Sequence, residues 1–169
     1  YNLGEILTDH NELARDLVKQ FKPLEYFGDY LVHGYYPFFL QGLKTYNIKL
    51  QSVISHVIEN EIALASNIEL RGAHKLKRLL QSIAGALPYQ PNVKKLAEAL
   101  EVNRTTLLTY IDLLEKAGLT RNLYSAGSFY SRLTKPGKIL LASSNLHYAL
   151  MTAEEGSGAI RESFFGIEV

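Results

Sequence analysis

Apolar side chains recur every three or four positions over much of the chain, which is the spacing of amphipathic helices. The pattern predicts a helix over residues 3–21, which breaks at Lys22 because a residue that precedes proline avoids the α region. A short helix over residues 24–33 follows and is expected to end at Gly34, which can adopt the left-handed conformation of a C-cap. The aromatic run over residues 34–39 is interpreted as a packing corner, with a ligand cage as the alternative.

The middle of the chain continues the helical pattern. Residues 43–58 carry an apolar stripe in register, and the pattern weakens through residues 59–65, where we expect the helix to fray. A new unit begins at Asn67 or Glu69. There is no repeat of fixed period and no low-complexity tract.

From about residue 70 the pattern predicts three helices followed by two strands. The first helix ends before Pro88, and the other two begin at the capping residues Asn92 and Asn103, whose side chains can accept a backbone hydrogen bond from the first turn. Gly118 ends the third helix. The remaining predicted elements are strands over residues 119–124 and 129–133 and a hairpin turn at residues 125–128.

Residues 92–119 resemble a winged helix-turn-helix. Two short helices cross at a tight turn in that fold, so the small Ala97 fits where they meet and Val102 fills the turn. Leu107 and Ile111 anchor the second of these helices on the first, and the following hairpin is the wing. The predicted fold class is therefore mainly α, with a helical segment plus a winged helix-turn-helix that carries a small β-hairpin wing.

The charge distribution suggests what this fold could bind. The chain has 169 residues, and its 18 Lys and Arg against 17 Asp and Glu give a formal net charge of +1. Residues 71–138 hold twelve of the cations and four of the acids, so this block carries +8 and the remainder −7. A block this basic in a balanced chain indicates an anionic partner, and the alternative is a solvated surface with an excess of lysine.

The third helix of a winged helix enters the major groove of DNA, where its N-terminal side chains meet base edges and phosphates. Arginine can bond two acceptors of guanine, and threonine hydroxyls commonly bind phosphate. We therefore predict that duplex DNA contacts the helix over residues 103–117 and the wing. The candidate contact residues are Asn103, Arg104, Thr105, Thr106 and Thr109 on the helix, with Arg121, Arg132 and Lys135 on the wing and its exit. Winged helices also serve as protein-docking modules, and this alternative stays open.

The residues favour no other chemistry. The chain has no cysteine, which removes disulfides, thiolate zinc sites and cysteine nucleophiles. Its five histidines form no His-x-x-x-His pair, no acidic cluster has metal-ligand spacing, and no Gly-x4-Gly-Lys-Ser/Thr loop is present. We expect no catalytic residue, metal ligand or cofactor in this chain. Without an 18-residue apolar run or a visible signal peptide, we expect no membrane partner and a cytoplasmic location.

Three segments, taken in order, carry a resemblance to a known family. They are the tyrosine-proline segment over residues 30–40, the region over residues 70–133, and residues 135–150 followed by 158–165 with the ending Arg-Glu-Ser-Phe-Phe. Together they look like the middle part of a prokaryotic AAA-type P-loop ATPase. That family has an N-terminal ATPase module, a lid, a winged helix and a C-terminal domain similar to restriction endonucleases.

The resemblance implies three parts. They are residues 1–68 as a helical lid or linker region, 69–135 as the winged helix-turn-helix domain, and 136–169 as the start of an incomplete C-terminal nuclease-like domain. The last part should hold a strand at residues 139–141 and a helix near residues 159–165, and Glu162 matches the first acidic position of the nuclease-like core. ATP and Mg²⁺ are implied for the full-length protein, whose P-loop lies upstream, so this chain should be inactive alone.

Three functions remain open from the sequence. The first is a DNA-binding module of such an ATPase. The second is an interaction or coupling module that links the ATPase module of the same parent chain to its C-terminal effector without DNA, motivated by the aromatic hinge at residues 34–39. The third is a free-standing transcriptional regulator.

Overall fold

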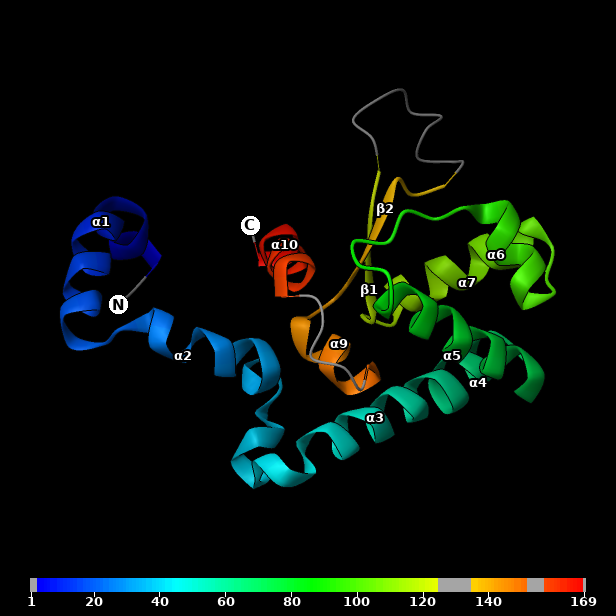
Figure 1. The fold of residues 1–169 in the computed structure, drawn as a ribbon, viewed down its shortest axis with the longest axis horizontal. Coiled ribbons are helices and arrows are strands. Elements are labelled where there is room, and N and C mark those ends of the chain that lie inside the picture. Colours follow the sequence, from blue (N-terminus) through cyan, green and yellow to red (C-terminus); the bar gives the residue numbers. More distant parts are fainter. Residues whose placement is uncertain (1–2, 125–134, 152–156, 169) are drawn as a thin grey trace.

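The computed structural model describes residues 3–124, 135–151 and 157–168 (Figure 1). The N-terminal part is a series of helical elements joined by short turns. In chain order these are α1 (Leu3–Gln20), α2 (Pro23–Asp29), the π-helical turn η1 (Tyr30–Gly34), the 3-10 turns η2 (Pro37–Gln41) and η3 (Leu43–Thr45), α3 (Tyr46–His56), the π-helical turn η4 (Val57–Ile62) and α4 (Ala63–Ala65). The predicted break at Pro23 is present, and η1 ends at Gly34 as expected, but Gly34 does not take the left-handed conformation predicted for it.

The second half of the chain holds the remaining helices and the described strands. These elements are α5 (Leu70–Ala84), α6 (Val93–Leu100), α7 (Arg104–Lys116), β1 (Thr120–Leu123), β2 (Lys138–Leu141), α9 (Ser144–Leu150) and α10 (Ser157–Glu168). The described chain is therefore mainly helical with a small antiparallel hairpin, which confirms the predicted fold class.

Helix α1 stands apart from the other described helices (Figure 1). A kink at Asp9, where φ is −116° and ψ is 20°, interrupts it. The helix is confirmed, but the described part of its apolar face is not covered by the rest of the chain. Leu7 is 70% exposed, and Leu17, Val18 and the following Phe21 are exposed as well.

Residues 59–65 are helical, so the prediction that they fray is wrong. The turn η4 and the short α4 carry the helix onward from α3, and Ile58 and Ile62 are buried in the core. A π-helical turn adds a residue to the helical repeat, which changes which side chains face inward. The helix then stops before Asn67, whose positive φ of 50° ends the helical path.

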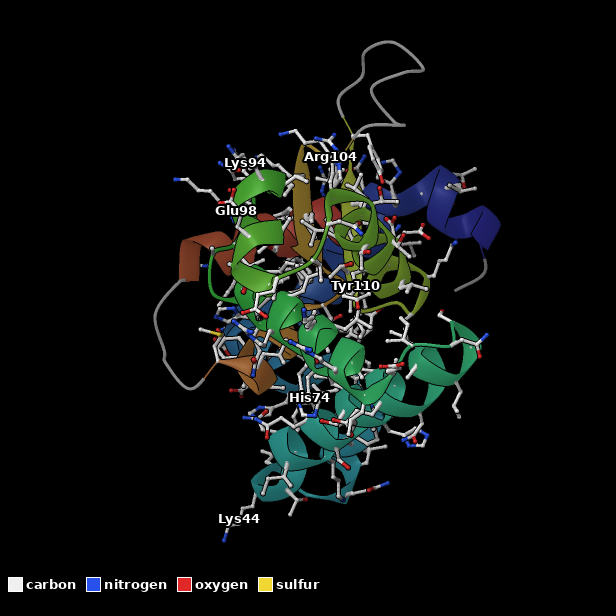
Figure 2. All side chains as sticks on the ribbon, turned by 90° about the vertical axis from the view of Figure 1, so that its right-hand side faces the viewer. Lys44, His74, Lys94, Glu98, Arg104 and Tyr110 are labelled. Atoms are coloured by element: carbon white, nitrogen blue, oxygen red, sulfur yellow. The ribbon has the colours of Figure 1, made fainter. Side chains whose placement is uncertain are left out.

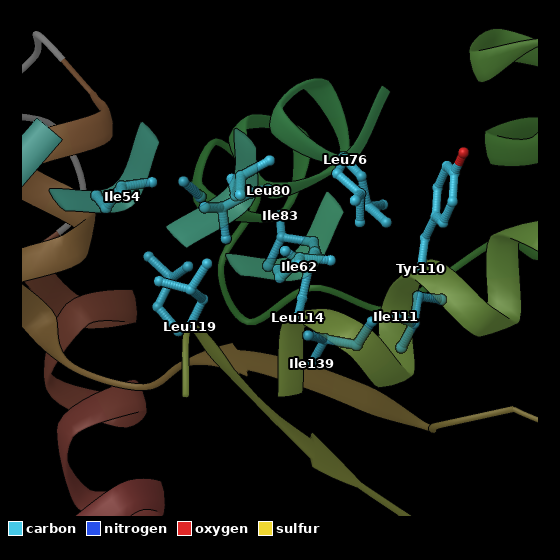
Figure 3. Packing of buried hydrophobic residues seen from close by; sticks show 14 of the residues in the cluster. Ile54, Ile62, Leu76, Leu80, Ile83, Tyr110, Ile111, Leu114, Leu119 and Ile139 are labelled. Atoms are coloured by element: carbon cyan, nitrogen blue, oxygen red, sulfur yellow. The ribbon is translucent and has the colours of Figure 1, made fainter. Parts of the chain in front are cut away.

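Helix α5 lies in the middle of the hydrophobic core, where it contacts η4, α6, α7, α9 and β2 (Figure 3). Its apolar stripe, which includes Leu76, Leu80 and Ile83, is fully buried. Leu114 from α7 and Ile139 from β2 meet this stripe in the same cluster. The core thus joins the predicted three-helix unit to the sheet.

Strands β1 and β2 pair antiparallel, with Thr120 opposite Leu141 and Leu123 opposite Lys138. Between α5 and α6, Tyr89 adds an isolated bridge on the other side of β2: the Tyr89 N–H donates to the Ile139 carbonyl at 3.1 Å, and the Ile139 N–H donates to the Tyr89 carbonyl at 2.8 Å. The second strand is therefore bonded on both edges.

This pairing differs from the prediction. The strand at residues 139–141 is present, but we expected it to open a separate domain, whereas it is the partner of β1. Its residues Ile139 to Leu141 are all buried, because the strand lies between the helices and α10 and has no solvent face. The strand predicted over residues 129–133 and the turn at residues 125–128 lie outside the described residues.

Helix α9 ties the N-terminal helices to this core through one buried side chain. Asn145 is 0% exposed and makes four hydrogen bonds. Its Oδ1 accepts from the Tyr35 N–H at 2.7 Å and from the Tyr46 hydroxyl at 2.8 Å. Its Nδ2 donates to the carbonyl of Leu31 at 2.7 Å and to that of Tyr30 at 3.2 Å. Within the aromatic run, the backbone of Tyr35 is therefore held against α9, while the side chains of Tyr35 and Phe39 stay exposed.

A second polar side chain of α9, His147, is also buried. Its Nδ1 lies 3.1 Å from the Ala84 carbonyl, which can only accept, so Nδ1 carries the proton. Burial lowers the pKa of His147, and the hydrogen bond to Ala84 opposes this effect. The folded state therefore keeps this ring neutral more strongly than the unfolded chain does.

We expect the free energy of unfolding to fall as the pH is lowered. Above about pH 7 the ring is neutral in both states, but below the ordinary histidine pKa near 6.5 the unfolded chain gains a proton first. The free energy of unfolding falls by up to about 1.4 kcal/mol per pH unit until the pH reaches the lowered pKa that His147 has in the folded state. Urea unfolding between pH 7.5 and 5 measures it. His147→Gln should make the free energy of unfolding depend less on pH. The control His74→Gln, at an exposed position (Figure 2), should keep the full dependence. Equal slopes of unfolding free energy against pH in the two variants would contradict the assignment of this dependence to His147.

Helix α10 packs against β2 and α9. Phe164 makes edge contacts with Phe27 at 5.2 Å and with Tyr30 at 6.0 Å between ring centroids. Glu162 forms a 3.0 Å ion pair with Lys138 at the outer end of β2. The helix predicted near residues 159–165 is thus confirmed, and the structure uses Glu162 as a surface ion-pair partner.

Candidate nucleic-acid interface

Helices α6 and α7 both begin at asparagine caps, as predicted. Asn92 Oδ1 accepts from the Lys95 N–H at 3.1 Å, and Asn103 Oδ1 accepts from the Thr106 N–H at 2.7 Å. Between the helices, Glu101 takes a left-handed conformation with φ 52°, so the chain reverses within a few residues. This turn brings the starts of both helices to one end of the molecule, where Figure 2 shows Lys94 and Arg104.

Helix α7 exposes most of the predicted contact residues. Its inner face is buried through Leu107, Tyr110, Ile111 and Leu114. The side chains of Asn103, Arg104, Thr105 and Thr109 are exposed, and that of Thr106 is half-buried. Two of these groups are already engaged within the helix: Asn103 serves as the cap, and the Thr109 hydroxyl donates to the Thr105 carbonyl at 3.1 Å.

The hairpin supplies further exposed cations. Arg121 on β1 and Lys135 before β2 are both exposed. The Gly137 N–H donates to the Leu123 carbonyl at 2.8 Å, which holds the chain after Lys135 beside the outer end of β1. Arg132, the remaining predicted residue, lies outside the described residues.

The cations of the basic block divide into two groups. Six have a polar partner: Arg71, Lys75, Lys77, Arg78, Lys116 and Lys138. In the part of the chain that the structure describes, five have no ion-pair or hydrogen-bond partner for the side chain: Lys94, Lys95, Arg104, Arg121 and Lys135. The second group is free to meet an external anion.

Acidic side chains lie close to this surface and limit its charge. Glu98 and Glu101 line a groove of about 530 Å³ together with Lys94 and Arg104. On the outward face of α7, the carboxylate of Asp112 binds Lys116 at 2.7 Å and raises the pKa of that lysine, mainly through the hydrogen bond. The cations at the helix starts therefore share their groove with two carboxylates, whereas Arg121 and Lys135 of the hairpin lie outside it.

The threonines lie beside a second groove, of about 590 Å³, between α7 and the start of α5. Thr105, Thr106 and Thr109 line one side of it, and Arg71 and Lys75 line the other. Because Arg71 pairs with Glu101 and Lys75 donates to the Glu101 carbonyl, these two cations are partly satisfied. The threonines thus lie between Arg71 and Lys75 at the start of α5 and Arg104 at the start of α7.

Glu115 fixes the hairpin to α7, a role that the sequence reasoning missed. Its Oε1 accepts from the Asn122 N–H and its Oε2 from the Asn122 Nδ2, both at 2.8 Å. Such a carboxylate bonded to the backbone of the first strand sets the angle at which the hairpin leaves the helix. A glutamate near the end of a helix carries no distinctive spacing, so only the fold reveals this contact.

We expect Glu115→Ala to lower the free energy of unfolding by about 2 kcal/mol, because it removes two hydrogen bonds to a charged group. Chemical denaturation measures this change. Glu115→Gln keeps the amide oxygen as one acceptor and should recover about half of the loss. Asp112→Ala, which removes only an exposed ion pair one turn away, should cost no more than about 0.5 kcal/mol; a cost equal to that of Glu115→Ala would contradict the assignment.

Within the described ranges, no three His, Asp or Glu side chains gather in a way that could hold a metal ion. The sequence has no Gly-x4-Gly-Lys-Ser/Thr loop. Of the helices described, none has the length and apolar character needed to cross a bilayer.

The fold and this surface define a mainly helical module with a small hairpin and a cationic end. The chain belongs to the family described as Domain of unknown function (DUF8612), whose model matches residues 24–156 and leaves out α1. It is 29% identical over 112 residues to the Uncharacterized protein MJ1637 of Methanocaldococcus jannaschii. The match covers 65% of this chain and 24% of that relative, so the chain spans about a quarter of the relative's length. No solved structure matches the chain.

Proposed function

We propose that the chain is a winged helix-turn-helix module that binds duplex DNA, within a longer AAA-type ATPase. Three helices followed by an antiparallel hairpin, with α6 and α7 joined by a short turn, agree with the winged-helix resemblance. The length of the archaeal relative leaves room for further modules in a family member. The ATPase assignment rests on the resemblance of the sequence alone.

The observation that carries the DNA proposal is the set of unpartnered cations. Lys94 and Lys95 belong to the start of α6, Arg104 to the start of α7, and Arg121 and Lys135 to the hairpin. Helix starts add the positive end of the helix dipole and unpaired N–H groups, which favour phosphate. Arg104 lies at the first position of α7, where an arginine can also read a guanine edge.

The test is a fluorescence-anisotropy titration of the full chain on a labelled random duplex, at about 50 and 200 mM salt. If all five cations contact phosphate, the slope of log affinity against log salt is about −4.5, and the affinity falls roughly 500-fold between these concentrations. No binding at either concentration would overturn the proposal. An affinity that is the same at both salt concentrations would overturn the assignment of the cations as phosphate contacts.

A second function is supported by a different surface. The apolar face of α1, with Leu7, Leu17 and Val18 exposed, is typical of a helix that docks on another protein. We infer as the alternative that the chain is a coupling module, in which α1 binds the ATPase module of the same parent protein. Gel filtration of the chain with that module would show a complex, and Leu17→Asp with Val18→Asp should abolish it. Ile48→Asp, at an exposed apolar position of α3, is the control. The absence of a complex would remove this alternative.

A further inference from the structure

A surface pocket of about 320 Å³ lies between α2 and the 3-10 turns, away from the cationic end. It is lined by Tyr26, Asp29, Tyr30, His33, Phe39 and Leu43. Tyr26 and Asp29 come from α2 and Tyr30 and His33 from η1, and all four line the same pocket. We call this the aromatic pocket.

The aromatic rings of the pocket are held in place by packing. The ring of Tyr26 stacks on Phe21 with centroids 4.9 Å apart. Tyr30 packs against Phe164 and over Gly34, where a Cβ atom would overlap its ring. The rings nevertheless reach solvent, since Tyr26 is 55% and Phe39 41% exposed. A ligand would therefore meet rings that are already ordered, which lowers the entropy cost of binding.

The charge of the pocket is negative and uncompensated. No lysine or arginine lines it, and the carboxylate of Asp29 has no ion pair or hydrogen bond to another residue that the structure describes. The pocket also belongs to the part of the chain that carries −7, outside the basic block. Electron-rich ring faces beside a free carboxylate attract an organic cation.

We propose that the aromatic pocket binds the guanidinium group of an arginine side chain presented by a protein partner. A guanidinium is planar, so it stacks on a tyrosine or phenylalanine ring while its N–H groups bond a carboxylate at the ring edge. Asp29 lies one helical turn from both Tyr26 and His33, which supplies the carboxylate beside the rings. The pocket opens on the surface between half-exposed side chains, as suits a side chain that stays attached to its own protein.

The test uses the full chain labelled with ¹⁵N and two ligands, N-acetyl-arginine amide and its neutral isostere N-acetyl-citrulline amide. The arginine compound should shift the amide resonances of Tyr26, Asp29 and Phe39, and the citrulline compound should shift them much less. Asp29→Asn should lower the affinity for N-acetyl-arginine amide about three- to fivefold, and Phe39→Leu should lower it by a similar factor. Glu12→Gln, which removes an exposed carboxylate on α1, should leave the affinity unchanged.

Equal shifts with both ligands, or unaltered affinity in Asp29→Asn, would overturn the proposal. So would tighter binding of N-acetyl-trimethyllysine amide, because the pocket would then prefer a spherical cation to a planar one. Since none of these readouts involves DNA, the result is independent of the proposed function at the other end of the molecule.

Discussion

Replacement of Asn145 by alanine should lower the free energy of unfolding by about 3–5 kcal/mol and the melting temperature by about 6–20 °C. The side chain is fully buried, and its four hydrogen bonds join α9 to η1, to the following turn and to α3. Alanine would leave the Tyr35 N–H, the Tyr46 hydroxyl and the Leu31 carbonyl without this partner, the last two in the buried interior. Each such group costs about 1–3 kcal/mol when it is left unpaired.

Two further variants separate this hydrogen-bond network from simple loss of volume. Asn145→Asp keeps the shape but replaces the donating amide with a buried carboxyl group, so it should be at least as destabilising as alanine. Tyr46→Phe removes one of the two donors to Oδ1 and should cost about 1 kcal/mol. The control is Asn60→Ala on the exposed side of η4, which should stay within about 0.5 kcal/mol. A loss below 1.5 kcal/mol for Asn145→Ala would show that the network does not hold the N-terminal helices in place.

The helices could be predicted because their signals are local. The apolar stripe of α5, the asparagine caps of α6 and α7, and the end of α7 before Gly118 all depend on residues within one or two turns of one another. The fraying predicted after α3 was wrong for a related reason. A π-helical turn changes the helical period, and a search for a constant period reads that change as the end of the helix.

The strand pairing and the polar core could not be predicted, because their partners are distant in sequence. The sequence of residues 138–141 indicates a strand, but it does not reveal that β1 is the neighbouring strand. Asn145 and His147 of α9 are both buried against groups more than 60 residues away, so no local pattern marks them as core residues. In the candidate interface, the sequence predicted Arg104, Arg121 and Lys135 as contacts, but it did not single out Lys94 and Lys95 and could not tell which cations already had partners.

The double substitution Arg104→Ala with Lys135→Ala should have the largest effect on DNA binding. Both side chains are exposed and unpartnered, one at the start of α7 and the other at the hairpin exit. Loss of two phosphate contacts makes the slope of log affinity against log salt shallower by about 1.8. Each contact contributes about 1.2 kcal/mol at 100 mM salt through counterion release, so the affinity there should fall roughly fiftyfold.

The matched control removes the same charge from the opposite end of the molecule. Lys44→Ala with Lys49→Ala also deletes two cations, and Lys44 lies far from Arg104 (Figure 2). If binding depends on net charge alone, the two double variants will lose affinity equally and the surface at α6, α7 and the hairpin has no special role. If the cations at the helix starts contact phosphate, the control keeps both its slope and most of its affinity. The comparison therefore separates a DNA footprint from a general attraction of exposed lysines and arginines to a polyanion.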